Sequence, residues 1–214
     1  MGQIYNVRNM GNTLKLPIEL LNEHYRLILA SKSPRRHQLL HEMGLKFNIW
    51  THRPINEELP IGIKPQSAAL YLAEKKAEAY VHDLSPNDIL LTCDTVVIYG
   101  KHILNKPKNA EDARQMLKTL SGKKHAVITG ICLRTYQKQI LTSDTTYVWF
   151  SLLTQWEIDY YLDQFQPFDK AGAYGIQEWI GLIGITKIQG SYFNVVGLPT
   201  SLVYQKLSQI KYKK

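Results

Sequence analysis

The chain has 214 residues, and 44% of them are hydrophobic, which is enough to build one large core or two small lobes that share a core. Lys and Arg number 26 against 18 Asp and Glu, so the formal net charge of +8 at pH 7 favours anionic partners such as nucleotides, nucleic acid or acidic lipid. No apolar stretch approaches the roughly 20 residues that cross a bilayer, which argues against a membrane-spanning protein.

The N-terminal half is predicted to begin with a polar extension, residues 1–25, that is partly ordered at most. It lacks the hydrophobic region of a signal peptide. The two cysteines, Cys93 and Cys132, lie in apolar runs without CxxC spacing, so we expect free thiols in a cytoplasmic protein. A single domain is expected over residues 26–211. Its first elements are predicted, in chain order, as a strand over 26–30, a helix from Ser33-Pro34 to a stop at Gly44, a strand over 47–51, a loop over 52–64 and a helix over 65–80.

The longest strands are predicted after residue 87. Residues 88–99 (DILLTCDTVVIY) are β-branched and almost wholly apolar, as in a central strand covered on both faces. The elements predicted after it are a helix capped by Asn109 that ends at Ser121-Gly122, a hairpin of strands 126–136 and 140–150, a helix with a Thr154/Glu157 capping box that ends near Phe165, a Gly-rich stretch over 172–197 and a last helix from Pro199. This mixed order favours an α/β fold with a mixed sheet.

A Ser-rich turn precedes the first predicted helix, in LASKSPRRHQLL. A helix N-terminus offers unpaired backbone N–H groups and partial positive charge, so this turn is a natural phosphate cradle. Arg35 and Arg36 add two cations at the helix end where cations are unfavourable. The pair indicates anion binding, and the alternative is an ordinary solvated pair on the surface.

One carboxylate, Asp94, interrupts the apolar strand LLTCDTVVIYG. Burying an ionised carboxylate is costly unless it meets a metal, a cation or a proton-transfer role. The alternatives are an Asp at a strand end or a partner for a buried Arg. Lys106 follows the turn at Tyr99-Gly100, and it returns towards Asp94 if the strands on either side of the turn pair.

Two further pairs are ordinary surface charges when taken singly: Glu57-Glu58 in the loop and Lys75-Lys76 on the next helix. Together with Asp94 and the arginines they would suit magnesium-assisted attack on a phosphoryl group. A P-loop and a G-x-G-x-x-G motif after a strand are absent, and the helical histidines at 37 and 41 lack the glutamate of a zinc protease. The basic residues are scattered, and no nucleic-acid-binding motif appears.

Five segments resemble, in order and spacing, the Maf family of nucleoside triphosphate pyrophosphatases; they are LASKSPRRHQLLHEMG, CDTVVIYGKHILNKP, EDARQMLKTLSGKKHAVITG, DKAGAYGIQ and GSYFNVVGLP. The resemblance covers about residues 26 to 210. It implies hydrolysis between the α and β phosphates, with a divalent metal, Mg²⁺ or Mn²⁺. It also implies an elongated mixed β-sheet flanked by helices, like that of inosine-triphosphate pyrophosphatases, with two lobes around a cleft. Because members of the family often dimerise, a homodimer is expected as well.

The resemblance assigns roles to nine residues of this chain. Asp94 matches the catalytic acidic residue, and Glu57 is the best match to an acidic loop residue, with Glu58 as the alternative. We take Asp94 and Glu57 as the metal ligands, whose ion activates the water that attacks the α-phosphorus. The residues expected to bind substrate are Ser31, Arg35, Arg36, Lys76, Thr95, Lys106 and Gln177.

Substrate choice is also implied by the resemblance. The family branch that acts on dTTP and UTP carries a form similar to AGAYGIQ, residues 171–177, and Arg35, Thr95 and Gln177 match positions linked to that choice. Gln177 has a donor and an acceptor, as the uracil or thymine imide edge requires, whereas Asn105 departs from the family pattern. Two alternatives remain: housecleaning of modified nucleotides, and a nucleotide- or nucleic-acid-binding regulator of cell division without turnover. We expect no stable nucleic-acid partner.

Overall fold

The computed structural model describes residues 17–210 of the chain. Seven strands form one mixed sheet in the order β2-β1-β3-β5-β6-β7, and β4 pairs with β3 outside this path. Strand β1 is parallel to β2 and β3, and the other pairs are antiparallel. The strands are β1 (Arg26–Leu29), β2 (Phe47–Ile49), β3 (Asp88–Tyr99), β4 (His102–Leu104), β5 (Lys124–Thr135), β6 (Gln139–Phe150) and β7 (Ile185–Gln189).

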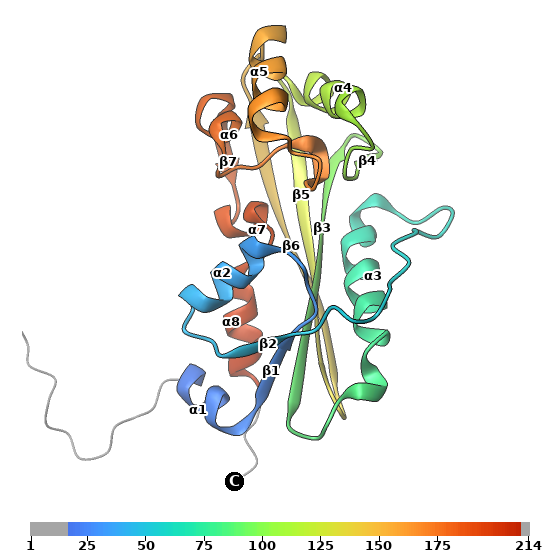
Figure 1. Cartoon of the computed structure of the whole chain (residues 1–214), viewed down its shortest axis with the longest axis vertical. Helices are drawn as coiled ribbons and strands as arrows, with labels where there is room; N and C mark the ends of the chain where they lie inside the picture. Colours follow the sequence, from blue (N-terminus) through green and yellow to red (C-terminus); the bar gives the residue numbers. More distant parts are fainter. Residues whose placement is uncertain (1–16, 211–214) are drawn as a thin grey trace, which may run out of the picture.

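Three of these strands, β3, β5 and β6, have 12 residues each and would span about 40 Å at the usual rise per residue. They run the length of an elongated molecule and carry helices at both ends (Figure 1). The helices are α1 (Pro17–His24), α2 (Pro34–Glu42), α3 (Pro65–Glu78), η1 (Val81–Asp83), α4 (Ala110–Leu120), α5 (Gln155–Phe165), η2 (Ala171–Ala173), α6 (Trp179–Gly184), α7 (Tyr192–Val196) and α8 (Thr200–Ser208). The predicted elongated α/β class is confirmed.

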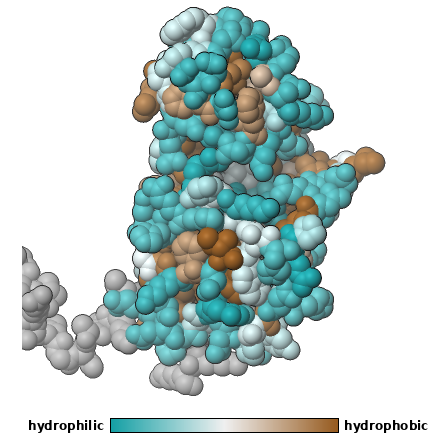
Figure 2. Space-filling view, viewed as in Figure 1, coloured by the Kyte–Doolittle hydropathy of each residue, from teal (hydrophilic) through white to brown (hydrophobic). Residues whose placement is uncertain are grey.

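Separate hydrophobic clusters hold the two lobes. In the lower lobe of Figure 1, α1, α2 and α8 pack on one face of the sheet, with Leu21, Leu40 and Val203 fully buried. Helix α3 covers the opposite face. In the upper lobe, α4 and α5 pack against the far ends of the long strands around Leu117 and Tyr161. Because the same strands pass through both clusters, the lobes share one sheet. Hydrophilic residues dominate the surface seen in Figure 2.

Most predicted elements match the structure closely. Strand β3 has the predicted bounds, Asn109 caps α4 by accepting from the backbone of Asp112, and Thr154 forms its capping box with Glu157. The hairpin of β5 and β6 also forms. Differences concentrate in short elements: the Gly-rich stretch after residue 171 contains η2, α6, β7 and α7, none longer than six residues. Such short pieces carry too few residues for a period to appear.

The predicted N-terminal extension falls partly outside the described residues, since residues 1–16 are not described, and neither is residue 211 of the predicted domain. Residues 17–24 of the predicted extension form α1. Leu21 is 1% exposed and belongs to the same cluster as Val203 and Leu207 of α8. A polar eight-residue segment therefore becomes helical because tertiary contacts bury its few apolar side chains.

Gly130 of β5 sets how closely α3 approaches the sheet. It pairs with Asp94 of β3, and a Cβ built on it would lie 2.4 Å from the backbone carbon and oxygen of Ala69 in α3. No side chain fits there, so helix backbone packs directly on strand backbone. This close approach brings Lys76, further along α3, to the carboxylate of Asp94.

We expect Gly130→Ala to lower the free energy of unfolding by about 2 kcal/mol, because α3 must move away from β5. Turnover should fall with it, since Lys76 would be carried away from Asp94. Urea unfolding and steady-state rates check both effects. Ser143→Ala is the matched control, because Ser143 is the exposed partner of Gly130 on β6. An unchanged unfolding curve for Gly130→Ala would contradict the close-packing argument.

Candidate functional site

One cavity of about 710 Å³ lies between the two lobes. It contains every residue predicted for the site: Ser31, Arg35, Arg36, Glu57, Lys76, Asp94, Thr95, Lys106 and Gln177. These residues come from the loop before α2, from α2 itself, from the loop before α3, and from α3, β3, the segment after β4 and the loop after η2. The fold thus gathers into one cavity residues that lie up to 146 positions apart, from Ser31 to Gln177.

The guanidinium of Arg36 already donates hydrogen bonds to several groups of the protein. It donates to the carbonyls of Gly197 at 2.8 Å and Cys93 at 2.9 Å, and to the hydroxyls of Ser31 at 3.3 Å and Thr95 at 3.1 Å. A guanidinium has five N–H donors, so four bonds leave about one for a phosphate. Arg36 therefore mainly holds the turn before α2 in place, and little of its donor capacity is left for an anion.

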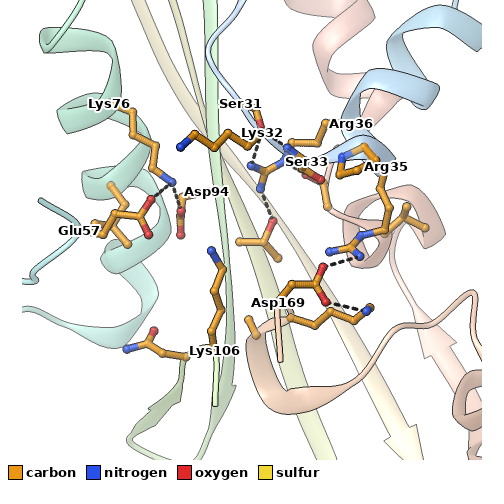
Figure 3. Close-up of a pocket in the computed structure, with 18 of the residues that line it drawn as sticks. Ser31, Lys32, Ser33, Arg35, Arg36, Glu57, Lys76, Asp94, Lys106 and Asp169 are labelled. Atoms are coloured by element: carbon orange, nitrogen blue, oxygen red, sulfur yellow. Dashed lines mark hydrogen bonds and ion pairs between the residues drawn. The ribbon is translucent and has the colours of Figure 1, made fainter. Parts of the chain in front are cut away.

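Arg35 is different, because its one side-chain hydrogen bond within residues 17–210 is to another side chain across the cavity. It donates to the Asp169 carboxylate at 3.2 Å, and the two side chains are 31% and 59% exposed. Such an exposed pair is weak, so a phosphate can replace Asp169 at Arg35. Figure 3 shows this pair on the wall of the cavity opposite Lys76 and Glu57.

The start of α2 leaves backbone donors for an anion. Ser33 is the N-cap residue, but its side chain makes no capping hydrogen bond, contrary to the usual role of a serine there. The hydroxyl of Ser31 accepts the backbone N–H of Ser33 instead, at 3.2 Å. His37 contacts the Ser31 carbonyl at 2.7 Å, so this histidine supports the turn.

Lys76 joins the two predicted metal-ligand carboxylates. Its ammonium lies 2.5 Å from Asp94 and 2.9 Å from Glu57, and its side chain is 11% exposed. Burial alone would lower the pKa of Lys76, but the two carboxylates outweigh burial and raise it. Burial likewise tends to raise the pKa of Glu57, and Lys76, with Lys106 and Arg36 further off, lowers it overall. Lys76 and Glu57 are therefore both charged near neutral pH.

The two loop glutamates point in different directions. Glu57 faces Lys76 inside the cavity, whereas Glu58 bonds to Asn56 on the exposed side of the loop and is not part of the lining. Lys106 enters as the sequence suggested, because β4 pairs with the end of β3 through Val97 and Leu104. Its ammonium points towards Asp94 (Figure 3).

Charges in the cavity sum to a clear excess of positive sign. Seven cationic side chains line it against four carboxylates, an excess of three. The cations are Lys32, Arg35, Arg36, Arg53, Lys76, Lys106 and Lys170, and the carboxylates are Glu57, Asp94, Asp169 and Glu178. A polyphosphate, which carries several negative charges close together, suits such a cavity.

The residues present fit a hard divalent cation. Asp94 and Glu57 oxygens approach a common ammonium within 2.9 Å, so they lie close enough to share one ion. Within residues 17–210, no group of three or more His, Cys, Asp or Glu is arranged so that it could hold a metal ion. Two carboxylates alone suit Mg²⁺, which commonly takes its remaining ligands from water and substrate phosphates.

Sequence reasoning missed several residues of the cavity. Asp169, Lys170 and Glu178 lie in or next to DKAGAYGIQ, a segment that carried the family resemblance without any role for these charges. The available signal was that these charges flank a short segment with two glycines, Gly172 and Gly175. Tyr174, also in this segment, is buried, and its hydroxyl lies 2.8 Å from Nε2 of His125 on β5.

Burial lowers the pKa of His125 to about 4. Protonation therefore favours the unfolded chain, and stability is lost as pH falls from about 6.5 towards 4. We expect about 2 kcal/mol less stability at pH 5 than at pH 7 from this group, measured by urea unfolding. In His125→Leu the loss of stability between pH 7 and pH 5 should be smaller by about 2 kcal/mol. The variant His41→Gln, at an exposed histidine, should lose as much stability as the unsubstituted protein. An equal slope in His125→Leu and the unsubstituted protein would show that His125 is not the titrating group.

A cationic cleft that holds two adjacent carboxylates beside an uncapped helix N-terminus defines a protein of the phosphoryl-hydrolase class. Within that class, the chain belongs to the Maf family, because the model of the Maf-like protein family matches residues 26–210.

Relatives are similar over nearly their whole length. A protein named dTTP/UTP pyrophosphatase from Phocaeicola vulgatus is 48% identical over 188 residues, covering 88% of this chain and 97% of its own. One of the same name from Christiangramia forsetii is 46% identical over 192 residues, covering 90% and 97%. Among solved structures, a HAM1 protein from Coxiella burnetii aligns with a TM-score of 0.48 at 14% identity, over 87% of this chain and 100% of its own. A likeness of that size carries no functional argument.

Proposed function

We propose that the protein hydrolyses dTTP and UTP to the nucleoside monophosphate and pyrophosphate. The observation that carries this proposal is the cavity between the lobes, in which Asp94 and Glu57 face the cations of α2, α3 and the segment after β4. The relatives described above bear the name dTTP/UTP pyrophosphatase, at up to 48% identity. Removal of non-standard pyrimidine nucleotides, as a housecleaning activity, is part of the proposal.

The chain's own residues would divide the work as follows. Asp94 accepts a proton from water as the water oxygen bonds to the α-phosphorus. The bond between the α-phosphorus and the oxygen that bridges the α and β phosphates then breaks, and pyrophosphate leaves. Lys76 and Lys106 neutralise charge that grows on the phosphate oxygens. Arg35 and the backbone donors at the start of α2 hold the outer phosphates. Thr95, fixed by Arg36, and Gln177 complete the substrate contacts.

Asp94 and Glu57 would hold the divalent cation, Mg²⁺ or Mn²⁺, which when bound supplies charge neutralisation and lowers the pKa of water. The ammonium of Lys76 contacts one oxygen of each carboxylate, Oδ1 of Asp94 and Oε1 of Glu57, so the second oxygen of each would remain for the ion. No helix among residues 17–210 is long and apolar enough to cross a bilayer. A cytoplasmic location and a homodimer remain predictions.

A substrate panel tests the proposal directly. The full chain is incubated with the canonical triphosphates and with base-methylated pyrimidine triphosphates, each with Mg²⁺ or Mn²⁺, and pyrophosphate is measured. We expect release from dTTP and UTP, and its loss when a chelator is added. Orthophosphate in place of pyrophosphate would mean cleavage at another bond and would refute the proposal.

The regulator without turnover is not favoured. A protein that only binds polyanions gains nothing from two carboxylates among its cations, yet Asp94 and Glu57 face into the cavity and are held there by Lys76. In the same panel, binding of triphosphates without any release of product would support the regulator instead.

A further inference from the structure

A buried hydroxyl lies directly behind the loop that carries Gln177. Tyr161 of α5 is 0% exposed, and its ring stacks on Phe165 at a centroid distance of 5.2 Å. Its hydroxyl accepts the backbone N–H of Gly175 at 3.0 Å and donates to the carboxylate of Glu178 through a short hydrogen bond. Burial, followed by the bond to Glu178, raises the pKa of Tyr161 far above its usual range, so the phenol keeps its proton as a donor.

The loop packs tightly around these two contacts. A Cβ built on Gly175 would lie 2.8 Å from the Glu178 carboxyl carbon and 3.1 Å from Lys170. The other Glu178 oxygen lies 2.9 Å from the ammonium of Lys170, which also contacts Asp169 at 2.7 Å. Asp169 in turn pairs with Arg35. A chain of contacts therefore runs from the buried hydroxyl to the arginine at the cavity wall.

Gln177 occupies the position between the two residues that Tyr161 holds. The tyrosine fixes the backbone two residues before Gln177 and the side chain one residue after it. The backbone N–H of Glu178 also donates to the carbonyl of Gly175 at 3.0 Å, which closes a turn with Gln177 inside it. Gln177 itself is exposed and makes no side-chain hydrogen bond to any residue from 17 to 210, so its amide is available to a ligand.

We propose that the hydroxyl of Tyr161 is a positioning group for base selection: by holding Gly175 and Glu178 it orients the Gln177 amide towards the pyrimidine. This inference rests on the proposed function. Tyr161 does not line the cavity and touches no substrate, so its effect on selectivity passes through the loop. An amide held in one orientation distinguishes the imide edge of uracil, with its N–H donor and carbonyl acceptors, from the amino-bearing edge of cytosine.

Tyr161→Phe tests this, because it removes the hydroxyl and leaves the ring stacked on Phe165. We expect the preference for UTP over CTP, as the ratio of kcat/KM values, to fall about tenfold, the size expected for one misplaced hydrogen bond. KM for UTP should rise, while kcat stays within about twofold, because Asp94 and Lys76 are untouched. Tyr160→Phe is the matched control, since Tyr160 is the exposed neighbour on the same helix. It should leave the ratio unchanged.

A purely structural role would slow both substrates equally and lower the melting temperature without changing the ratio, and that result would overturn the inference. A double variant sharpens the test: once Gln177→Ala has removed the amide, adding Tyr161→Phe should not lower the ratio further. A further drop would show that Tyr161 does not act through Gln177.

Should Tyr161→Phe fail to fold, the partly exposed Glu178 supplies the same test. Glu178→Gln keeps an oxygen that accepts from Tyr161 and should retain most of the preference, whereas Glu178→Ala should lose it. Equal ratios in these two variants would refute the inference. Absence of pyrophosphate release from UTP by the unsubstituted protein would instead refute the proposed function, so the two failures are distinguishable.

Discussion

Asp94→Asn is expected to lower kcat for UTP and dTTP by at least about 100-fold, the typical contribution of a positioned general base. The substitution keeps the shape of the side chain and removes its charge. It takes away the proton acceptor and one of the two carboxylates that would hold the cation. The loss should appear in kcat more than in KM, because the phosphate-binding groups on α2 stay in place. Steady-state pyrophosphate release checks this.

Folding should survive this change, because Lys76 keeps its contact with Glu57 at 2.9 Å. Thermal unfolding of the variant verifies that point alongside the rates. Asp163→Asn on the exposed side of α5 is the matched control and should leave both measurements unchanged. Turnover by Asp94→Asn at the rate of the unsubstituted protein would remove Asp94 from the chemistry, whatever its contacts.

The central strand and its carboxylate were predictable because one charge among apolar residues is a strong local signal. A twelve-residue, mostly apolar run such as β3 predicts a buried strand. A carboxylate within it, Asp94, then requires a partner. The partner could not be identified in the same way. That Lys76 and not Lys75 reaches Asp94 depends on how α3 packs across Gly130, and no local pattern records that contact.

The loop after α5 shows the opposite limit. Its family-like residues were visible in the sequence, but the network behind them joins Tyr161 on one helix to Gly175 and Glu178 fourteen and seventeen positions later. A tyrosine on the apolar face of a helix is most simply core. Only the three-dimensional arrangement reveals that its hydroxyl contacts residues on both sides of Gln177.

The adjacent arginines show that identical residues in one motif can have separate tasks. Arg35→Ala is expected to change the free energy of unfolding by less than about 0.5 kcal/mol, since its pair with Asp169 is exposed. KM for UTP should rise about tenfold, because a charge-assisted bond to a phosphate is lost. Urea unfolding and steady-state kinetics measure the two effects.

Arg36→Ala should behave differently, losing about 3 kcal/mol of stability and nearly all turnover. Its removal leaves the carbonyls of Cys93 and Gly197 without their donor and releases the hydroxyls of Ser31 and Thr95. Arg36→Lys separates charge from geometry: it retains the cation, but an ammonium has three donors and lacks the planar fork, so stability should recover only in part. Full recovery of stability and kcat in Arg36→Lys would mean that charge alone matters there. Matching losses of stability in Arg35→Ala and Arg36→Ala would contradict the division between them.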